Sequence, residues 1–368
     1  MKKEHKLYLA SPLCFYPNGY SMWNSYRKEA EFYGFTVTMP NDNKLVEEGE
    51  TVSKREMSDR IFQNCVWGIT GVDGILVNLE TYRGSEPDGG SIYEMGMAYA
   101  VGARCYGYTR DKRTVGVKYQ AARYNEEVTG AYDINGNVLG HHELPFSVDV
   151  CAAAKIIEGN FSDCLMIYRT DLEEESKLQG VRGYKCVKDE PKVTIEKGDR
   201  PVVYVSTSDR DNPDAAEKYE QWRKVLNDAG FEAYFPTDKA AGVEDIETDD
   251  IYTKAYNLFD RYTKHVRNCD IIILDLNDYR GGYEPNSDVA FEAGFAYMQG
   301  KKMYGYMDDV KPMIERIPNV LTAEDSRDFN GMNVENFDGP LNLMFGASVK
   351  LFDDEFPEMI RKIAEDLK

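Results

Sequence analysis

The chain repeats itself, and this constrains its fold more than any other feature of the sequence. Four segments of the first half return in the same order in the second half, 195 to 198 positions later. The pairs are KLYLASP at 6–12 with VVYVSTS at 202–208, VDGILVNLETYRG at 72–84 with CDIIILDLNDYRG at 269–281, EPDGGSIYEMGMAYAVGARCYGY at 86–108 with EPNSDVAFEAGFAYMQGKKMYGY at 284–306, and LPFSVDVCAAAKII at 144–157 with GPLNLMFGASVKLF at 339–352. Such ordered self-similarity predicts a tandem duplication of one structural unit.

The repeat also predicts the domain boundaries. We expect two domains, residues 1–175 and 201–368, joined by a charged linker at 176–200. A length of 368 residues suits two domains. Within the linker, residues 185–197 alternate enough to form an edge strand.

Each unit alternates short apolar runs with longer amphipathic stretches. In the first unit we expect strands at 7–10, 35–39, 74–79 and 103–108, helices at 21–34, 58–70 and 91–101, and the last helices within 152–172. This alternation predicts an α/β fold of two Rossmann-like doubly wound parallel sheets in tandem. Ligands of such sheets bind beyond the carboxyl ends of the strands, which points to the loop 80–90 and the helix that follows it.

The charge balance limits the class of partner. The chain has 64 Asp and Glu against 44 Lys and Arg, a formal net charge of −20. An acidic surface repels phosphate, so we expect no nucleic-acid partner, no membrane partner and a preference for an uncharged substrate.

Cysteine and histidine do not form a metal-ligand pattern. The seven cysteines are scattered without a C-x-x-C pair, and the four histidines have no ligand spacing, so we expect reduced buried thiols and no metal. The N-terminus has no apolar signal region and no stretch is long enough to span a membrane, which favours a cytoplasmic protein.

Three motifs, YLASP at 8–12, EPDGGSIYEMGMAYAVG at 86–102 and NLM at 342–344, resemble the nucleoside 2-deoxyribosyltransferase family over nearly the whole chain outside the linker. The resemblance implies a flavodoxin-like fold and, without cofactor, exchange of the nucleobase of a 2′-deoxynucleoside. It also implies roles for single residues. Glu94 matches the nucleophile, Asp88 the base-contacting acid and Tyr8 the tyrosine that holds the nucleophile. Asn342 and Met344 match a pair that a neighbouring subunit contributes, and Asp73 and Gly90 are further substrate-binding candidates.

The chemistry of these residue types agrees with that assignment. A carboxylate that attacks an anomeric carbon divides one hard displacement into two easier ones, and a second carboxyl can protonate the leaving base. Purely structural roles compete with it. Ser91 and Glu94 fit a helix capping box, although Val289 replaces Ser91 in the second repeat while Glu292 remains. Asp88 fits a turn, Tyr8 a strand core, Met344 a gap-filler and Asn342 a cap.

The two repeats differ in complementary ways. Asn286 replaces Asp88 in the second repeat, and Ser147, Val148 and Asp149 replace the NLM motif in the first. If the repeats pair as two subunits do, one complete site results, with Asn342 and Met344 beside Glu94. The other would be a vestigial site with Glu292, Tyr204 and Asn286. We therefore expect an intramolecular pseudodimer, with further association into homo-oligomers left open.

These observations favour a nucleoside deoxyribosyltransferase that acts on 2′-deoxynucleosides and free nucleobases. Two alternatives remain at this stage. One is an N-glycosidase that hydrolyses deoxynucleosides or their 5′-monophosphates, and the other is a non-catalytic nucleoside or nucleotide sensor. The sequence does not distinguish purine from pyrimidine substrates.

Overall fold

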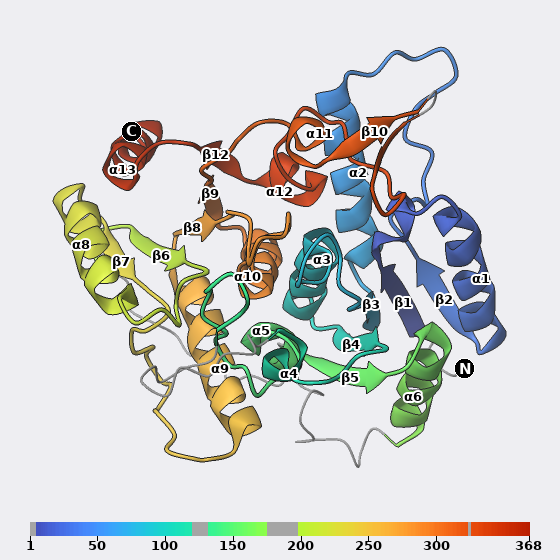
Figure 1. Ribbon diagram of the computed structural model, residues 1–368, viewed down its shortest axis with the longest axis horizontal. Coiled ribbons are helices and arrows are strands. Elements are labelled where there is room, and N and C mark those ends of the chain that lie inside the picture. The colour runs from blue at the N-terminus through green and yellow to red at the C-terminus, as the bar shows by residue number, and fades with distance from the viewer. Residues whose placement is uncertain (1–4, 120–131, 175–197, 323–324) are drawn as a thin grey trace.

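The computed structural model describes residues 5–119, 132–174, 198–322 and 325–368 (Figure 1). The first repeat contains β1 (His5–Ala10), a 3-10 helix η1 (Pro12–Phe15), α1 (Gly19–Phe32), β2 (Phe35–Thr38), α2 (Lys54–Ile69), β3 (Gly74–Asn78), α3 (Gly89–Ala100), β4 (Arg104–Thr109), α4 (Val115–Tyr119), α5 (Val148–Ala153), β5 (Ala154–Glu158) and α6 (Phe161–Glu173). The predicted linker lies outside the described residues except for 198–200, as does its possible edge strand.

The second repeat follows the same order of elements. It contains β6 (Val202–Ser206), α8 (Ala215–Asp228), β7 (Glu232–Tyr234), α9 (Ile251–Asn268), β8 (Ile271–Asp275), α10 (Ser287–Met298), β9 (Lys302–Tyr306), α11 (Met313–Arg316), β10 (Asn319–Leu321), β11 (Ser326–Asp328), α12 (Leu343–Ser348), β12 (Lys350–Phe352) and α13 (Phe356–Asp366). Strands β10 and β11 form a small antiparallel hairpin.

Each repeat folds around one parallel sheet of five strands. The strand orders are β2-β1-β3-β4-β5 and, read in the same sense, β7-β6-β8-β9-β12. Both correspond to the flavodoxin-like order 2-1-3-4-5, in which ligands bind at the carboxyl end of the first and third strands. The central strands β3 and β8 are buried on both faces, which explains their continuous apolar sequence. The predicted fold class, two such domains in tandem, is confirmed.

One secondary-structure prediction is wrong. The sequence places the last helices of the repeat within 152–172, where α6 lies, but residues 154–158 form the edge strand β5, whose Ala154 pairs with Cys105 of β4. The Ala-rich segment before the strand favours a helix by propensity. Pairing with β4 and burial of Ile156 and Ile157 outweigh that local preference.

The two repeats pack through equivalent helices. Helices α3 and α10 lie side by side between the two sheets (Figure 1). An added Cβ at Gly96 would lie 2.1 Å from the carbonyl oxygen of Phe291, and one at Gly294 would lie 1.9 Å from that of Tyr93. Gly96 therefore allows α10 of the other repeat to approach α3 closely. From sequence alone, small residues such as Gly96 and Ala98 would suggest that α3 packs closely on the sheet of its own repeat.

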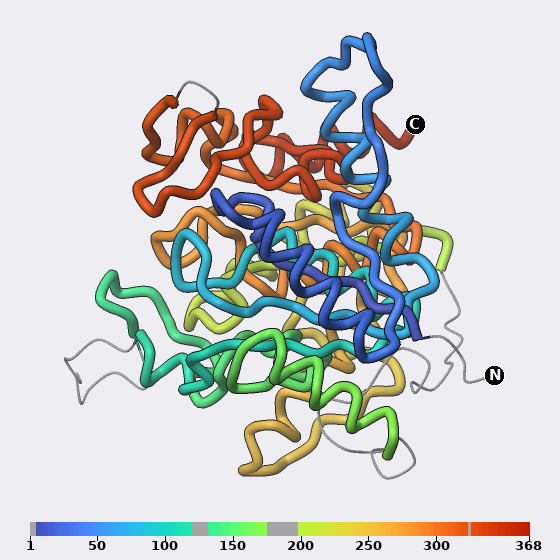
Figure 2. The backbone as a smooth tube through the Cα atoms, turned by 90° about the vertical axis from the view of Figure 1, so that its right-hand side faces the viewer, coloured from blue at the N-terminus to red at the C-terminus, as the bar shows by residue number. Residues whose placement is uncertain are grey.

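A segment of the second repeat also crosses to the first. Residues 336–348 lie against α2, and Figure 2 shows this red segment beside the blue of the first repeat. Lys54 of α2 pairs with Asp338 at 2.6 Å, and Arg55 donates a hydrogen bond to the carbonyl oxygen of Gly346. This crossing brings the NLM motif to the first repeat.

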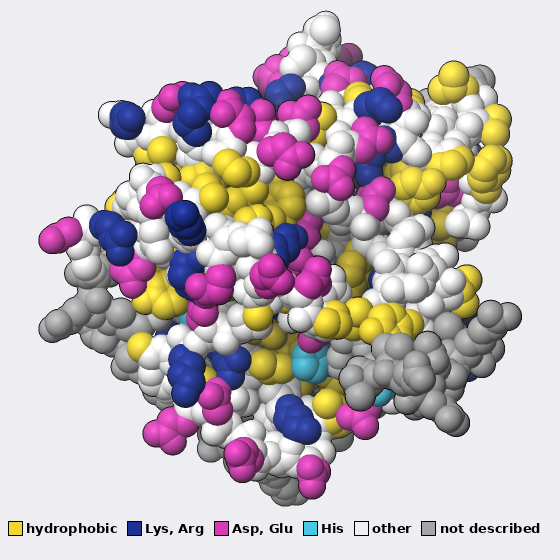
Figure 3. All heavy atoms as spheres, turned by 60° about the vertical axis from the view of Figure 1, so that its left-hand side comes forward, with side chains coloured by type: hydrophobic (Ala, Val, Ile, Leu, Met, Phe, Trp, Pro, Cys, Tyr) yellow, Lys and Arg dark blue, Asp and Glu magenta, His cyan; other side chains and the backbone are white. Residues whose placement is uncertain are grey.

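Acidic and basic side chains are interspersed over the face shown in Figure 3. No helix in the described part of the chain is long and apolar enough to cross a membrane.

Candidate active site

Helix α3 carries the candidate nucleophile at the carboxyl edge of the first sheet. Its N-cap is Asp88, which places Ser91 at the third helical position and Glu94 in the second turn. The capping-box role of Glu94 is therefore wrong, because Ser91 is inside the helix and cannot be the cap. Glu94 is only 5% exposed. Its Oε1 accepts a hydrogen bond of 2.5 Å from the hydroxyl of Tyr8 on β1, 86 positions away.

The surroundings of Glu94 favour its neutral form. The pKa of the Glu94 carboxyl is raised to about 8, mainly by burial and also by the nearby carboxyl of Asp88. Hydrogen bonds from the Tyr8 hydroxyl and the Cys65 thiol lower it. Because both donors act on the same carboxyl group, they stabilise the carboxylate once it forms and hold it in one orientation.

Asp88 has both a structural and a free oxygen. Its Oδ2 accepts hydrogen bonds from the backbone N–H of Ser91 at 2.8 Å and from the Ser91 hydroxyl at 2.6 Å. Its Oδ1 is buried and has no hydrogen-bond partner among the described residues. Burial raises the pKa of Asp88, although the hydrogen bonds from Ser91 oppose this. One oxygen thus caps the helix, while the other has no partner in a residue that lines the cavity beside Glu94.

Both repeats line this cavity, which has a volume of about 430 Å³. The first repeat contributes Asp88, Gly90 and Glu94, and the second contributes Asn342 and Met344. Asn342 caps α12 through its Oδ1, in agreement with the capping role expected for it. Its Nδ2 lies 2.6 Å from the position that a Cβ of Gly90 would occupy, so only glycine allows this approach.

Asp73 lies away from this cavity, contrary to the sequence prediction. It directly precedes β3, at the opposite edge of the sheet. There its Oδ2 accepts a hydrogen bond of 3.0 Å from the backbone N–H of Lys6. Asp73 cannot reach the cavity because ligand sites lie at the carboxyl ends of parallel strands, whereas Asp73 lies at the amino end of β3.

The cavity contains residues that the motifs did not reveal. Cys65 contacts Glu94 from α2, and Glu335 faces the cavity from the second repeat. Aromatic side chains form much of the remaining wall, namely Phe15, Tyr20, Trp23 and Phe337. An apolar wall with a few convergent carboxyls suits a planar ligand with polar edges. Among the described residues no group of His, Cys, Asp and Glu side chains is arranged to hold a metal ion.

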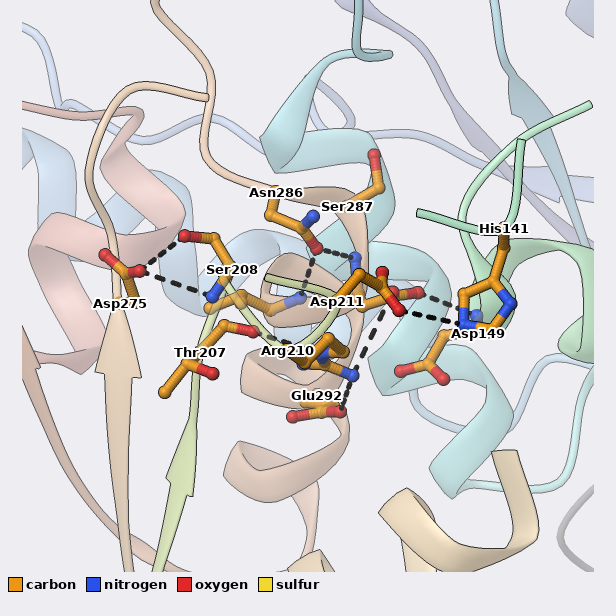
Figure 4. Close-up of polar contacts among 12 residues, drawn as sticks. His141, Asp149, Thr207, Ser208, Arg210, Asp211, Asp275, Asn286, Ser287 and Glu292 are labelled. Carbon is orange, nitrogen blue, oxygen red and sulfur yellow. Dashed lines mark hydrogen bonds and ion pairs between the residues drawn. The ribbon is translucent and has the colours of Figure 1, made fainter. Parts of the chain in front are cut away.

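The equivalent site of the second repeat contains an arginine (Figure 4). The guanidinium of Arg210 lies 3.2 Å from Oε1 of Glu292 and 3.9 Å from Asp288, and its Nε donates to the carbonyl oxygen of Thr207. Tyr204 donates a longer hydrogen bond of 3.3 Å to the same Glu292 oxygen. Arg210 is buried, so the carboxylate of Glu292 is paired with a fixed cation.

The replaced NLM segment lies at this second site. The backbone N–H of Asp149 donates to Asp288 at 2.8 Å, and burial together with the charge of Asp288 raises the pKa of Asp149 well above its ordinary value. Asn286 caps α10 with its side-chain oxygen, as Asp88 caps α3. The structure therefore brings Asn342 and Met344 to Glu94, and Ser147–Asp149 to the site of Glu292.

Arg210 has a neutral counterpart in the first repeat. Tyr204 follows Tyr8 by 196 positions, and the same spacing places Arg210 opposite Cys14. Cys14 lines the open cavity, where a small side chain leaves room for a ligand. The sequence does show that an arginine follows the buried strand in the second repeat only. That Arg210 contacts Glu292 can be seen only in the folded structure.

The protein is thus an α/β protein in which two flavodoxin-like domains of one chain pack together as the subunits of a dimer would. Both domains contribute to one cavity lined by carboxyl groups. The family comes from the sequence: the model of the nucleoside 2-deoxyribosyltransferase family matches residues 7–143 and again residues 203–344. The chain therefore belongs to the nucleoside 2-deoxyribosyltransferase family, as a tandem duplication.

Individual relatives match smaller parts. An uncharacterized protein of Schizosaccharomyces pombe is 27% identical over 117 residues, 32% of this chain and 54% of that protein, so the match spans about half of its length. A 2-deoxyribosyltransferase from Leishmania mexicana is 28% identical with a TM-score of 0.36, covering 45% of this chain and 97% of its own. A CMP N-glycosidase from Clostridium botulinum is 15% identical with a TM-score of 0.24, covering 45% of this chain and 99% of its own.

Proposed function

We propose that the protein transfers the 2-deoxyribosyl group of a 2′-deoxynucleoside from one nucleobase to another, with Glu94 as the nucleophile. The observation that carries this proposal is the arrangement around Glu94. Tyr8 holds its carboxyl in a cavity that also contains Asp88 of the same repeat and Asn342 of the other. Membership of the deoxyribosyltransferase family supports the same reaction.

The first half-reaction forms a glycosyl-enzyme. A carboxylate oxygen of Glu94 attacks C1′, and the bond from C1′ to the base nitrogen breaks. The base leaves with the bonding electron pair and takes a proton from Asp88. Burial raises the pKa of Asp88, which favours the protonated form that a general acid needs.

The second half-reaction reverses the first with another base. The nitrogen of the acceptor base attacks C1′, the ester bond to Glu94 breaks, and Asp88 takes back a proton. Hydrogen bonds from Tyr8 and Cys65 stabilise the carboxylate that is released. Asn342 and Met344 line the cavity from the second repeat and cover part of the space beside the ester.

The test is incubation with 2′-deoxyinosine, with and without added adenine, followed by chromatography of the products. We expect 2′-deoxyadenosine and hypoxanthine when adenine is present, and slow or no release of hypoxanthine without it. If hypoxanthine and free deoxyribose were released at the same rate with and without adenine, the protein would be a hydrolase. Binding of deoxyinosine without any product would identify a sensor, and either result would refute the proposal.

A further inference from the structure

Glu335 is one of four carboxyl residues that line the cavity, with Asp88, Glu94 and Asp325, and the proposed reaction does not use it. It belongs to the segment between β11 and α12 and enters the cavity from the second repeat. The residue as a whole is partly exposed, but its Oε2 is buried. A buried carboxyl oxygen without a hydrogen-bond partner costs free energy of folding, so an oxygen of this kind calls for a functional reason.

Unpartnered acceptors gather in this part of the cavity. Among the described residues, Oε2 of Glu335, Oδ1 of Asp88 and Oδ1 of Asn333 are buried and have no hydrogen-bond partner. All three residues line the same cavity. Oxygen atoms that accept hydrogen bonds are complementary to a ligand that offers several N–H groups.

The second site has no counterpart of Glu335. Asp133 and Asp328 accept equivalent backbone hydrogen bonds in their turns, 195 positions apart, and the same spacing places Gly140 opposite Glu335. An added Cβ at Gly140 would lie 1.7 Å from Oδ2 of Asp211, which pairs with His141 at 3.4 Å (Figure 4). No side chain equivalent to Glu335 therefore enters the second site, where the carboxyl of Asp211, paired with His141, occupies that space.

We propose that Glu335 recognises the nucleobase, accepting hydrogen bonds from N–H groups on its polar edge and favouring bases that carry an exocyclic amino group. The proposal rests on the deoxyribosyl transfer proposed above, because it assigns the base to this part of the cavity. In this proposal Glu335 of the second repeat selects the base, while Glu94 of the first repeat is the nucleophile.

Ionisation of Glu335 changes what it can bind. The pKa of the Glu335 carboxyl is raised to about 8, because burial and the nearby Asp88 carboxyl raise it by more than Arg83 and a backbone hydrogen bond from Leu343 lower it. The neutral acid offers one donor and one acceptor, which match the N1–H and O6 of guanine and hypoxanthine equally. The carboxylate offers two acceptors, which match N1–H and the 2-amino group of guanine only. Further ionisable groups that line the cavity or interact with these residues are Cys14, Tyr16, Tyr20, Cys65, Tyr82, Glu94, Glu284, Asp325 and Asp328.

The experiment compares two donor nucleosides at each pH. We would measure kcat/KM for 2′-deoxyguanosine and 2′-deoxyinosine with adenine as acceptor, from about pH 6 to about pH 8.5. Ionisation of Glu94 and Asp88 changes kcat/KM equally for both donor nucleosides. Its effect therefore disappears when the value for 2′-deoxyguanosine is divided by the value for 2′-deoxyinosine. For the unaltered protein we expect the ratio to rise about tenfold, the effect of one charge-assisted hydrogen bond.

Two variants isolate the side chain. Glu335→Gln keeps one donor and one acceptor, so we expect a ratio that stays at the low-pH value at every pH. Glu335→Met has a similar shape without polar atoms, so we expect kcat/KM to fall about tenfold or more for both donors, with the unfolding temperature unchanged or raised. A ratio independent of pH in the unaltered protein, or Glu335→Met with unaltered kcat/KM, would overturn the proposal.

A binding measurement separates this proposal from the proposed reaction. Calorimetric titration of Glu94→Gln with each nucleoside needs no turnover. Tighter binding of 2′-deoxyguanosine at high pH, lost in the double variant with Glu335→Gln, would support base recognition even if no exchange were observed. Equal binding of the two nucleosides at every pH would refute it.

Discussion

Glu94 combines two requirements that conflict at the scale of a single residue. A nucleophile must be a carboxylate, but burial in the cavity favours the neutral acid and raises the pKa of Glu94 to about 8. The donors on Tyr8 and Cys65 offset part of this effect. The native state therefore retains a proton that the unfolded chain loses near the ordinary value of about 4.3.

Replacing Glu94 with glutamine should stabilise the protein while removing its activity. Between the two pKa values the native state binds more protons than the unfolded state, so the stability of the unaltered protein falls as pH rises from about 4.3 to about 8. Glutamine does not titrate and still accepts the hydrogen bond from Tyr8. In urea unfolding, we expect the free energies of the two proteins to be similar near pH 4.3 and to differ by a few kcal/mol at pH 8. A difference that does not grow with pH would contradict this account.

Asp88→Asn separates capping from acid catalysis. Asn286 already caps α10 in the second repeat through its side-chain oxygen, which shows that asparagine can perform the structural role. An amide cannot protonate the leaving base, so we expect kcat for exchange to fall by about 10² to 10⁴. The unfolding temperature should change little. Activity within a few-fold of the unaltered protein would exclude Asp88 as the acid.

At the scale of elements, the segments that follow β1 and β6 determine whether a cavity is open. One places Cys14 in the cavity wall and the other places Arg210 against Glu292. The strands themselves are equivalent and carry Tyr8 and Tyr204 at matching positions. A single substitution should therefore convert one state into the other.

Cys14→Arg should close the open site. The new guanidinium would pair with Glu94, as Arg210 pairs with Glu292, and would occupy the space of the ligand. We expect exchange to fall at least about a hundredfold while the unfolding temperature is retained. Cys14→Ser is the matched control, and it should exchange at close to the unaltered rate. If Cys14→Arg remained fully active, the arginine could not be what closes the second site.

The predictability of these elements from sequence has physical limits. Buried strands such as β3 and β8 were predicted because a short, continuous apolar run is typical of a strand covered on both faces. β5 was missed because pairing with β4 outweighs the helix propensity of its alanines. The start of α3 was placed two residues late because Ser91 resembles a cap, whereas Asp88 provides it.

The same limits apply to the candidate site. Glu94, Asp88 and Tyr8 could be predicted because they belong to motifs, and the structure brings them together. Asp73 was misplaced because adjacency to a strand does not say which end faces the ligand. Arg210 and Glu335 were not identified, because their significance depends on contacts between segments far apart in the chain.

At the scale of the whole molecule, each repeat supports the other. Glu284 of the second repeat accepts a hydrogen bond of 2.9 Å from the backbone N–H of Gly89, at the start of α3. Glu86 of the first repeat accepts one from the hydroxyl of Ser287, at the start of α10. These two contacts are present even though the residues of the two sites differ. Each repeat therefore helps to hold the start of the other repeat's helix, α3 or α10, in place.

Asn342→Ser tests the contribution of the second repeat to the first site. Serine retains a capping oxygen for α12, and it is the residue that the first repeat has at this position, Ser147. Loss of the amide should lower kcat/KM about tenfold to a hundredfold, the effect of a hydrogen bond in a closed site. Ser147→Ala, the matched control beside Glu292, should leave the rate within about twofold. Equal effects of the two substitutions would refute the division of labour between repeats.

The most direct test of the central claim is mass spectrometry of the protein after rapid quenching during turnover of 2′-deoxyinosine. We predict one deoxyribosyl group per chain, on the peptide that contains Glu94, and its disappearance when adenine is added before the quench. The peptide that contains Glu292 should carry none, because Arg210 occupies that site. A deoxyribosyl group on Glu292, or continued exchange by Glu94→Gln, would contradict a single glycosyl-enzyme on Glu94.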